Sequence, residues 1–260
     1  MYSCDALTAS RVLWGDHFPD LTVPLVLDIQ FSITPADVSQ WWANSASHFS
    51  LEDLEKERGK FVFGLDHIPP VPTAAAEALL SAYAPNRSDH AALLRCEGHA
   101  CLVRPYLGRR RTRRGTREGE ETLWNHPLYL DQSLAILGLE GAKHIAREMA
   151  LGLAVLHWAA LVDSMDVEFV FGGTSAPSAT FAPSAGKRAT QLWLLDFDKA
   201  QKLQLPRSDA GEVSFGKTQM CSQMVTAVTA NDPYFPTPHA PHRPMDYGCD
   251  GDNEYVELLI

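Results

Sequence analysis

Apolar residues recur with helical spacing between Gly141 and Ala160, and this pattern predicts a long helix with one face in a core. Apolar and polar residues alternate from Val167 to Phe171, which predicts a strand with one buried face. The apolar run Leu192–Phe197 predicts the neighbouring strand. A helix followed by two adjacent strands is therefore the expected centre of the fold.

Weaker patterns place the remaining elements. Strands are expected at Val23–Ile33, Leu93–Arg95 and Ala100–Tyr106, and helices from Pro35 through Trp42 and at Leu51–Arg58, Ala74–Tyr83, Leu128–Leu139 and Val213–Val228. The strands on either side of Gly98 would form a hairpin with a buried thiol on each strand. Mixed helices and antiparallel strands predict an α+β fold. We expect an N-terminal α/β portion over residues 1–90, a core with an acidic cleft over 91–245, and an acidic tail over 246–260.

Charge is unevenly distributed along the chain. The 32 acidic and 22 basic residues give a net charge of −10, yet seven arginines lie between positions 104 and 117 with no acid among them. An acidic body repels nucleic acid in general, whereas a local arginine cluster can hold a phosphate backbone. The cluster therefore indicates either RNA contact or a solvated loop of mutually repelling charges.

Several classes of protein are disfavoured. The five cysteines are scattered, no basic and apolar leader begins the chain, and no apolar run approaches a membrane span, so we expect a reduced, cytoplasmic protein. Cys96, His99 and Cys101 are only three candidate ligands, whereas structural zinc takes four, and no metal is expected. We also expect no glycine-rich phosphate loop, no serine-hydrolase elbow and no cofactor.

The densest chemistry lies between Leu156 and Asp198. Its polar residues are His157 at a helix end, Asp163 and Asp166 in a turn, Glu168 on a strand, and Asp196 and Asp198 at the end of the next strand. Residues two apart on a strand share a face, so Asp166 and Glu168 are expected to point into one cleft. Buried carboxylates are costly unless they are paired or used. Structural alternatives remain: His157 satisfying helix-end carbonyls, a solvent-facing strand edge for the acids, and a capped helix end at Asn231.

Four blocks of sequence carry a resemblance to a known family. They are RPYLGRRR (Arg104–Arg111), LHWAALVDSMDVEFVFG (Leu156–Gly172), LWLLDFD (Leu192–Asp198) and NDPYFP (Asn231–Pro236). In this order they resemble a fungal family often labelled "zinc finger protein", some members of which are arginine-containing cyclodipeptide synthases. The resemblance implies an aminoacyltransferase of fungal secondary metabolism. Such an enzyme draws on arginyl-tRNA and a second aminoacyl-tRNA and closes a diketopiperazine ring, with no DNA or membrane partner.

The order of helix, acidic loop, strand and LDFD is also similar to protein-kinase-like folds. Glu168 stands where a kinase carries its metal-binding asparagine, and Asp198 replaces the glycine of the DFG motif. A degenerate kinase-like scaffold reused for another reaction is therefore expected. A phosphotransferase or pseudokinase, or a non-catalytic interaction module, remains the alternative.

Peptide-bond formation from aminoacyl-tRNA needs no ATP, because the ester is already activated. On the cyclodipeptide synthase hypothesis, Glu168 is the general base with help from His157, and Asp166 orients the substrate amine. The predicted substrate-binding residues are Asp196, Asp198 and, in reserve, Asp163 for the guanidinium, with Asn231 and Tyr234 for the second pocket. The predicted tRNA-binding residues are Arg104, Arg109, Arg110, Arg111, Arg113 and Arg114. Ser164 and Cys221 are candidate nucleophiles that nothing in the sequence favours, and the second amino acid and the oligomeric state stay open.

Overall fold

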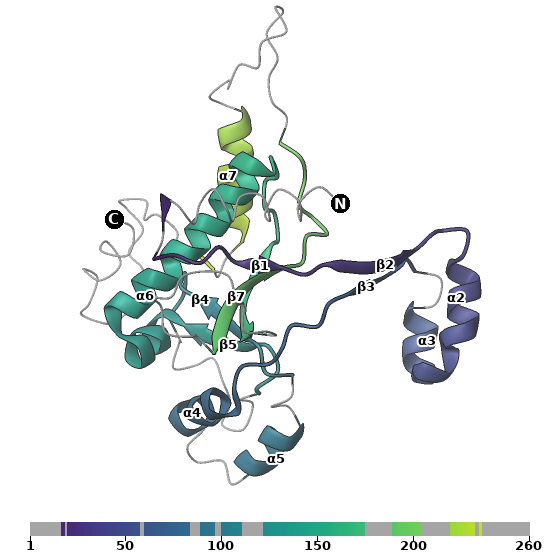
Figure 1. Cartoon of the computed structure of the whole chain (residues 1–260), viewed down its shortest axis with the longest axis horizontal. Coiled ribbons are helices and arrows are strands. Elements are labelled where there is room, and N and C mark those ends of the chain that lie inside the picture. The colour runs from purple at the N-terminus through teal and green to yellow at the C-terminus, as the bar shows by residue number, and fades with distance from the viewer. Residues whose placement is uncertain are drawn as a thin grey trace, which may run out of the picture. The chain divides into compact units, whose positions relative to one another are not determined.

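The computed structural model describes residues 17–18, 20–57, 60–83, 89–96, 100–110, 122–174, 189–203, 219–231 and 234–235. The chain divides into two compact units, one formed by residues 27–67 and the other by residues 1–26 together with 68–260 (Figure 1). The mixture of helices and strands confirms the predicted α+β class.

The described elements of the larger unit are β1 (Leu25–Val26), α4 (Thr73–Tyr83), α5 (His90–Cys96), β4 (Val103–Tyr106), β5 (His126–Tyr129), α6 (Leu130–Ala154), a π-helical turn (Val155–Ala159), β6 (Glu168–Gly173), β7 (Thr190–Leu195) and α7 (Gln219–Ala230). Those of the smaller unit are β2 (Ile29–Ile33), α2 (Val38–Ser45), a 3₁₀ turn (Ala46–His48), α3 (Leu51–Glu57) and β3 (Val62–Leu65). The helices predicted at Leu51–Arg58 and Ala74–Tyr83 are confirmed.

The larger unit is built on a five-stranded sheet in the order β1-β7-β6-β4-β5. The central pairings, β7 with β6 and β6 with β4, are antiparallel, as predicted for the strand pair around the acidic block. The outer pairings, β1 with β7 and β4 with β5, are parallel. The expectation of antiparallel strands therefore holds at the centre of the sheet and fails at its edges.

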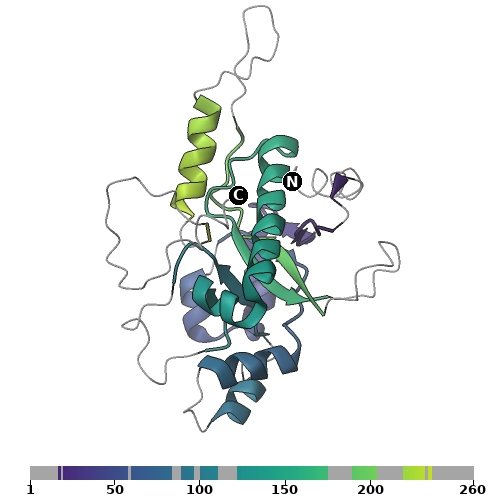
Figure 2. The same ribbon diagram turned by 90° about the vertical axis from the view of Figure 1, so that its left-hand side faces the viewer.

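Helix α6 packs along the sheet and forms the main core (Figure 2). Ile145 and Met149 on this helix lie in one apolar cluster with Phe169 and Leu194 from the two central strands. Two helices were predicted here, and a break at Gly138, where φ is 69° and ψ is 176°, divides residues 130–154 into two helical stretches as expected. Only glycine adopts that backbone readily. No described helix is long and apolar enough to cross a membrane.

The predicted hairpin at residues 93–106 is wrong in its first half. Residues 90–96 form helix α5, and only Val103–Tyr106 is a strand. Leu93 on this helix packs with Leu79 and Leu80 of α4 in a second apolar cluster. A short apolar run fits a helix or a strand equally well, and this packing favours the helix. Cys101 is buried as expected, but Cys96 is exposed.

The single strand predicted at Val23–Ile33 is also wrong. Its first part is β1 in the larger unit, and its second part is β2 in the smaller unit, where β2 pairs antiparallel with β3. In the smaller unit the rings of Trp41, Trp42 and Phe49 contact one another, and Trp42 Nε1 donates to the Lys60 carbonyl at 3.1 Å. These contacts hold α2 against the chain that leads into β3.

A close backbone approach explains the two glycines that end β6. The Gly173 N–H donates to the Pro69 carbonyl at 2.7 Å. A Cβ atom on Gly172 would lie 2.3 Å from Ile68 Cγ2 and 2.8 Å from the Pro69 carbonyl oxygen. Residues 68–70, expected only to interrupt secondary structure, therefore pack directly on this strand end.

Candidate functional site

The acids of the sequence block meet at one end of the β6–β7 hairpin. Glu168 at the start of β6 pairs with Leu195 at the end of β7, so the turn before β6 and the chain after β7 lie at the same end. Asp196 interacts electrostatically with three other carboxylates, those of Asp198, Glu168 and Asp166. We call these four residues the carboxylate cluster. Asp196 and Asp198 are exposed, and the other two are half-buried.

Asp166 and Glu168 were expected to share one face of a strand. That expectation was wrong, although both residues belong to the cluster. Asp166 does not lie on the strand, because β6 begins at Glu168. It lies in the preceding turn with φ at +61°, and Ser164 and Asp196 have similar positive values of 57° and 62°. Non-glycine residues in this backbone region are uncommon and often lie at functional sites.

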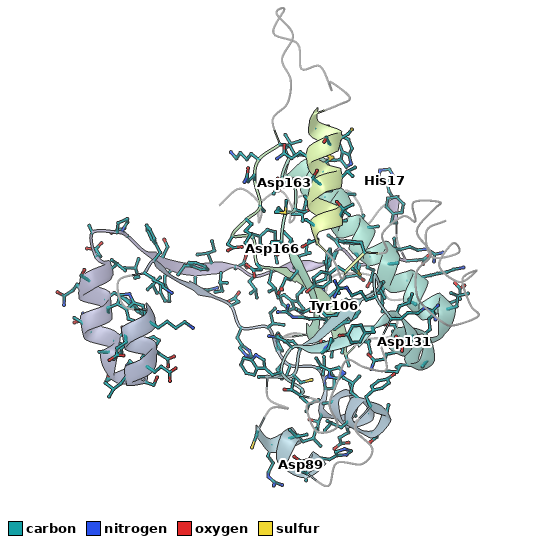
Figure 3. All side chains as sticks on the ribbon, turned by 180° about the vertical axis from the view of Figure 1, so that it is seen from behind. His17, Asp89, Tyr106, Asp131, Asp163 and Asp166 are labelled. Carbon is teal, nitrogen blue, oxygen red and sulfur yellow. The ribbon has the colours of Figure 1, made fainter. Side chains whose placement is uncertain are left out.

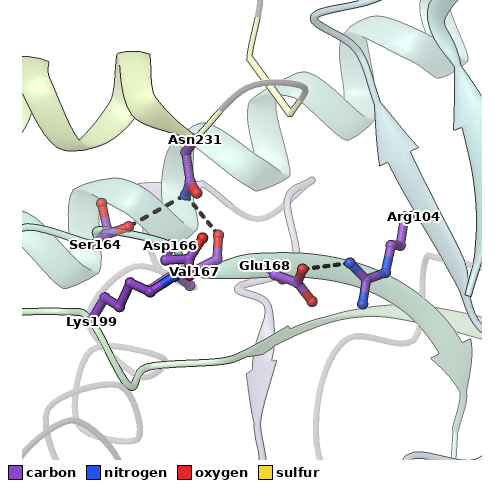
Figure 4. A network of polar contacts seen from close by, with 7 residues as sticks. All are labelled: Arg104, Ser164, Asp166, Val167, Glu168, Lys199 and Asn231. Atoms are coloured by element: carbon purple, nitrogen blue, oxygen red, sulfur yellow. Dashed lines mark hydrogen bonds and ion pairs between the residues drawn. The ribbon is translucent and has the colours of Figure 1, made fainter.

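Two acids of the cluster have a basic partner. Glu168 forms an ion pair with Arg104 on β4, and Asp166 forms one with Lys199 (Figure 4). Neither pairing follows from sequence spacing, because the partners lie 64 and 33 residues apart. Lys199 was not among the predicted site residues, and its place directly after Asp198 was the only available signal.

Asp196 and Asp198 have no ion pair within the described residues. Burial, followed by a hydrogen bond to Asp198 and the charge of that carboxylate, raises the pKa of Asp196 above its ordinary value. A like-charged neighbour disfavours ionisation, so two carboxylates this close favour either a shared proton or a cation between them. Lys199, the partner of Asp166, interacts electrostatically with both carboxylates, but no described basic side chain forms an ion pair with either of them.

Asp163 lies outside the cluster and is buried, in the loop that also carries Asp166 (Figure 3). Its Oδ1 accepts from the backbone N–H groups of Met165 at 3.1 Å and Gln201 at 2.9 Å, and its Oδ2 accepts from Gln223 Nε2 at 2.8 Å. Both carboxylate oxygens are therefore used to join the loop to the chain after β7 and to α7. This geometry favours a structural role for Asp163 over guanidinium binding.

His157 is also buried. Its Nε2 lies 2.8 Å from Ser164 Oγ and 3.3 Å from the Asp163 carbonyl oxygen. The Ser164 hydroxyl donates to that carbonyl at 2.6 Å, so Nε2 must carry the proton of the His157–Ser164 hydrogen bond. Burial lowers the pKa of His157. A neutral histidine that already donates a hydrogen bond to the loop favours the structural alternative for His157. Ser164, one of the candidate nucleophiles, is fully buried.

The residues of the NDPYFP block have different surroundings. Asn231 is buried at the end of α7, and its Nδ2 donates to the Val167 carbonyl at 2.7 Å and to the Ser164 carbonyl at 3.4 Å (Figure 4). Asn231 therefore fastens α7 to the loop. Tyr234 is only 3% exposed, and its ring contacts those of Tyr106 and Phe169. Burial and then the charge of Glu168 raise the pKa of Tyr234, so its hydroxyl stays neutral.

The predicted RNA-binding arginines fall into separate groups. Arg104 faces the carboxylate cluster from β4, whereas Arg109 and Arg110 follow that strand, exposed and half-buried respectively. Arg111, Arg113 and Arg114 lie outside the described residues. Cys221 is exposed on α7. Among the described residues, no three His, Cys, Asp or Glu side chains are arranged to hold a metal ion.

The expectation of no phosphate loop was wrong at the level of sequence. Residues 211–218 read GEVSFGKT and fit the pattern G-x-x-x-x-G-K-[ST], in which backbone N–H groups and a lysine bind phosphates. They lie outside the described residues, and helix α7 begins at the next position, Gln219. Searching for this pattern at its full spacing would have identified it.

One comparison with known proteins identifies a family over part of the chain. Residues 192–247 match the family described as "DUF3669: Zinc finger protein". This stretch includes most of β7, both acids of the LDFD block, and α7. No curated protein and no solved structure matches the chain. The family description names no reaction, and the kinase-like scaffold stays a prediction.

If Asp163 fastens the loop, Asp163→Ala should destabilise the fold by about 3 kcal/mol, because three hydrogen bonds to a buried charged acceptor are lost. The matched control is Asp198→Ala, an exposed acid nearby, which should change stability by about 0.5 kcal/mol or less. Urea unfolding measures both. Equal effects of the two substitutions would contradict the assignment of Asp163 as a structural residue.

Proposed function

We propose that this protein is an aminoacyl-tRNA-dependent cyclodipeptide synthase that joins arginine to a second amino acid. The observation that carries the proposal is the pair Asp196 and Asp198, two exposed carboxylates that interact with each other and form no ion pair with a described basic side chain. The family match over residues 192–247 and the order of the four sequence blocks support it.

The charge of the cluster suits an arginyl donor. Four carboxylates and the two cations paired with them leave a formal charge of −2. An arginyl ester with a protonated α-amino group carries two positive charges. A guanidinium presents a planar fork of N–H donors that matches carboxylate oxygens, so Asp196 and Asp198 are the proposed guanidinium site. Most other amino-acid side chains would leave this negative charge uncompensated.

The reaction asks little of the protein beyond alignment and proton transfer. The α-amino group has a pKa of about 7.7–8.0, so a carboxylate that removes its proton need not be strongly basic. Glu168 is the proposed base, and its ion pair with Arg104 fixes its position at the end of β6. Alignment of the amine with an activated ester contributes roughly 7–11 kcal/mol toward the barrier.

The arginine cluster is the proposed holder of the tRNA that carries the ester. Arg104 contacts the carboxylate cluster, and Arg109 follows five residues later along the same segment. Five residues span at most about 18 Å. An acceptor stem held by the arginines from position 109 onward therefore lies within a short reach of the carboxylates.

A nucleotide-dependent phosphotransferase is the second candidate function. The GEVSFGKT segment before α7 favours it, as does the kinase-like order of α6, loop, β6 and β7. Asp163 argues against a kinase mechanism. It lies five residues before Glu168, the spacing of a kinase's catalytic aspartate from its metal-binding asparagine, yet its oxygens already accept three hydrogen bonds.

A thermal-shift experiment separates the two candidates. On the main proposal, ATP with magnesium leaves the Tm of the wild-type protein unchanged, because the ester needs no further activation. A rise of several degrees that disappears in Lys217→Ala would instead support phosphate binding by residues 211–218.

The proposed base predicts a specific loss of product. The wild-type protein, expressed in a host with a full set of tRNAs, should release an arginine-containing diketopiperazine that mass spectrometry detects in the medium. Glu168→Gln should abolish the product while the protein stays folded, because the amide cannot accept the amine's proton at neutral pH.

Glu140→Gln is the matched control for this experiment. Glu140 is an exposed acid of α6 with its own basic partner, Lys143 at 3.7 Å, so the same substitution there should leave product formation unchanged. Full activity of Glu168→Gln would refute its role as base. A folded wild-type protein that yields no such product, but loses a protein partner when the cluster is mutated, would indicate an interaction module.

The arginine cluster predicts salt-dependent tRNA binding. Replacing Arg109, Arg110 and Arg111 with alanine should weaken tRNA binding and reduce the slope of log affinity against log salt by about 2 to 3, since each phosphate contact contributes roughly 0.7–0.9. Fluorescence anisotropy with labelled tRNA at several salt concentrations measures this slope.

The control removes the same charge elsewhere. Alanine at Lys56, Lys60 and Lys143 deletes three cations outside the cluster and should leave the slope unchanged. Equal slopes for the wild type and the arginine variant would contradict tRNA binding and support the interpretation of the cluster as a solvated loop.

A further inference from the structure

Two buried polar atoms beside Glu168 have no hydrogen-bond partner within the described residues. They are Arg104 Nε and the Tyr234 hydroxyl. The Phe169 backbone lies near that hydroxyl but is not aligned for a hydrogen bond. Tyr234 as a whole is 3% exposed, so water does not satisfy its hydroxyl from the outside.

These two side chains and Glu168 form one electrostatic group. Burial alone lowers the pKa of Arg104, but interactions with Tyr234 and Glu168 outweigh it, and the pKa is raised. Tyr234 in turn interacts with Glu168 and Arg104. The unpartnered hydroxyl therefore lies within electrostatic range of Glu168 and of Arg104, which is half-buried.

Leaving such atoms unpaired is unfavourable. Buried polar groups in folded proteins nearly always have a partner, and an unsatisfied one marks a place where a ligand or a bound water completes the site. Two such atoms on side chains that interact with the proposed base indicate that a ligand atom is the missing partner.

The chemistry of the two atoms defines that ligand atom. The guanidinium Nε–H is only a donor, and a neutral tyrosine hydroxyl can donate as well. Both can donate to a single oxygen acceptor. A cation would not satisfy Arg104, because it has no lone pair to accept from the guanidinium Nε–H. The missing partner is therefore an acceptor atom, and the carbonyl oxygen of an aminoacyl ester is one.

We infer that Arg104 and Tyr234 form a subsite for the carbonyl oxygen of the aminoacyl ester, next to the carboxylates that hold its guanidinium. This inference rests on the proposed function and assigns Arg104 to the reacting group instead of the tRNA backbone. Both atoms are shielded from solvent in the free protein, so the Arg104 side chain turns toward the oxygen on binding. The ion pair is about a fifth exposed, at 19% for Arg104 and 20% for Glu168, and can move in this way.

The subsite also gives Arg104 and Tyr234 a place in the reaction. When the amine nitrogen attacks the ester carbon, a C–N bond forms and negative charge develops on the carbonyl oxygen. A positive guanidinium and a hydroxyl donor stabilise that charge. The charge then returns to the carbon as the bond to the tRNA ribose oxygen breaks. The amine's proton passes to Glu168 and from there to the leaving oxygen.

Calorimetric titration with two small probes tests the subsite. Argininamide has the guanidinium, the amine and a carbonyl oxygen, and agmatine has the first two only. At pH 6 both amines are protonated, so the probes carry the same charge. The wild-type protein should bind argininamide more tightly than agmatine, by about five- to tenfold for each hydrogen bond gained at the carbonyl oxygen. Tyr234→Phe should weaken argininamide binding about five- to tenfold and leave agmatine binding unchanged.

The controls separate failure of the subsite from failure of the proposed function. Tyr83→Phe removes a hydroxyl that lies in the other apolar cluster and should change neither affinity. Arg104→Lys keeps the charge without the Nε–H donor and should also abolish the preference for argininamide. Equal binding of both probes to the wild type, or no effect of Tyr234→Phe, would overturn the subsite while the guanidinium site stands. Absence of binding by either probe would overturn both.

Discussion

The site depends on the antiparallel pairing of β6 with β7. This pairing places the turn before β6 and the chain after β7 at one end of a hairpin, so acids from two parts of the sequence meet. Four carboxylates in one place repel one another. Ion pairs hold Glu168 and Asp166, whereas Asp196 and Asp198 have only the more distant charge of Lys199 and still repel each other. A positively charged ligand would relieve this repulsion, and the proposed function follows from this imbalance.

Hydrogen bonds of buried polar residues hold the loop that carries part of the cluster. Three buried polar residues contribute their hydrogen bonds to it instead of to a ligand; they are His157, Asp163 and Asn231. They connect the loop to the end of α6, to the chain after β7 and to α7. Such support is needed because the loop includes three non-glycine residues with positive φ, Leu161, Ser164 and Asp166, each of which costs of order 1 kcal/mol or more. The rigid support lies in the core, and the carboxylates lie at the surface.

The sequence predicted the elements with strong periodicity and the gathering of the acids, but not the partners of each acid. Helix α6 and the β6–β7 pair follow from apolar spacing, and the acidic block marked the right end of the hairpin. Helix α5 was missed because a short apolar run fits a strand equally well. The partners of the acids lie far away in sequence: Arg104 lies 64 residues from Glu168, and Gln223 lies 60 residues from Asp163. Composition and spacing carry no information about such pairings.

The most direct measurement compares the binding of argininamide and citrullinamide by the wild-type protein and by the double variant Asp196→Asn, Asp198→Asn. Citrullinamide has nearly the same shape as argininamide but no charge on its side chain. The wild type should prefer argininamide by about 10- to 100-fold, the range expected for hydrogen bonds between charged groups, and the double variant should lose this preference. A double variant that stays folded and retains the wild-type preference would contradict the account.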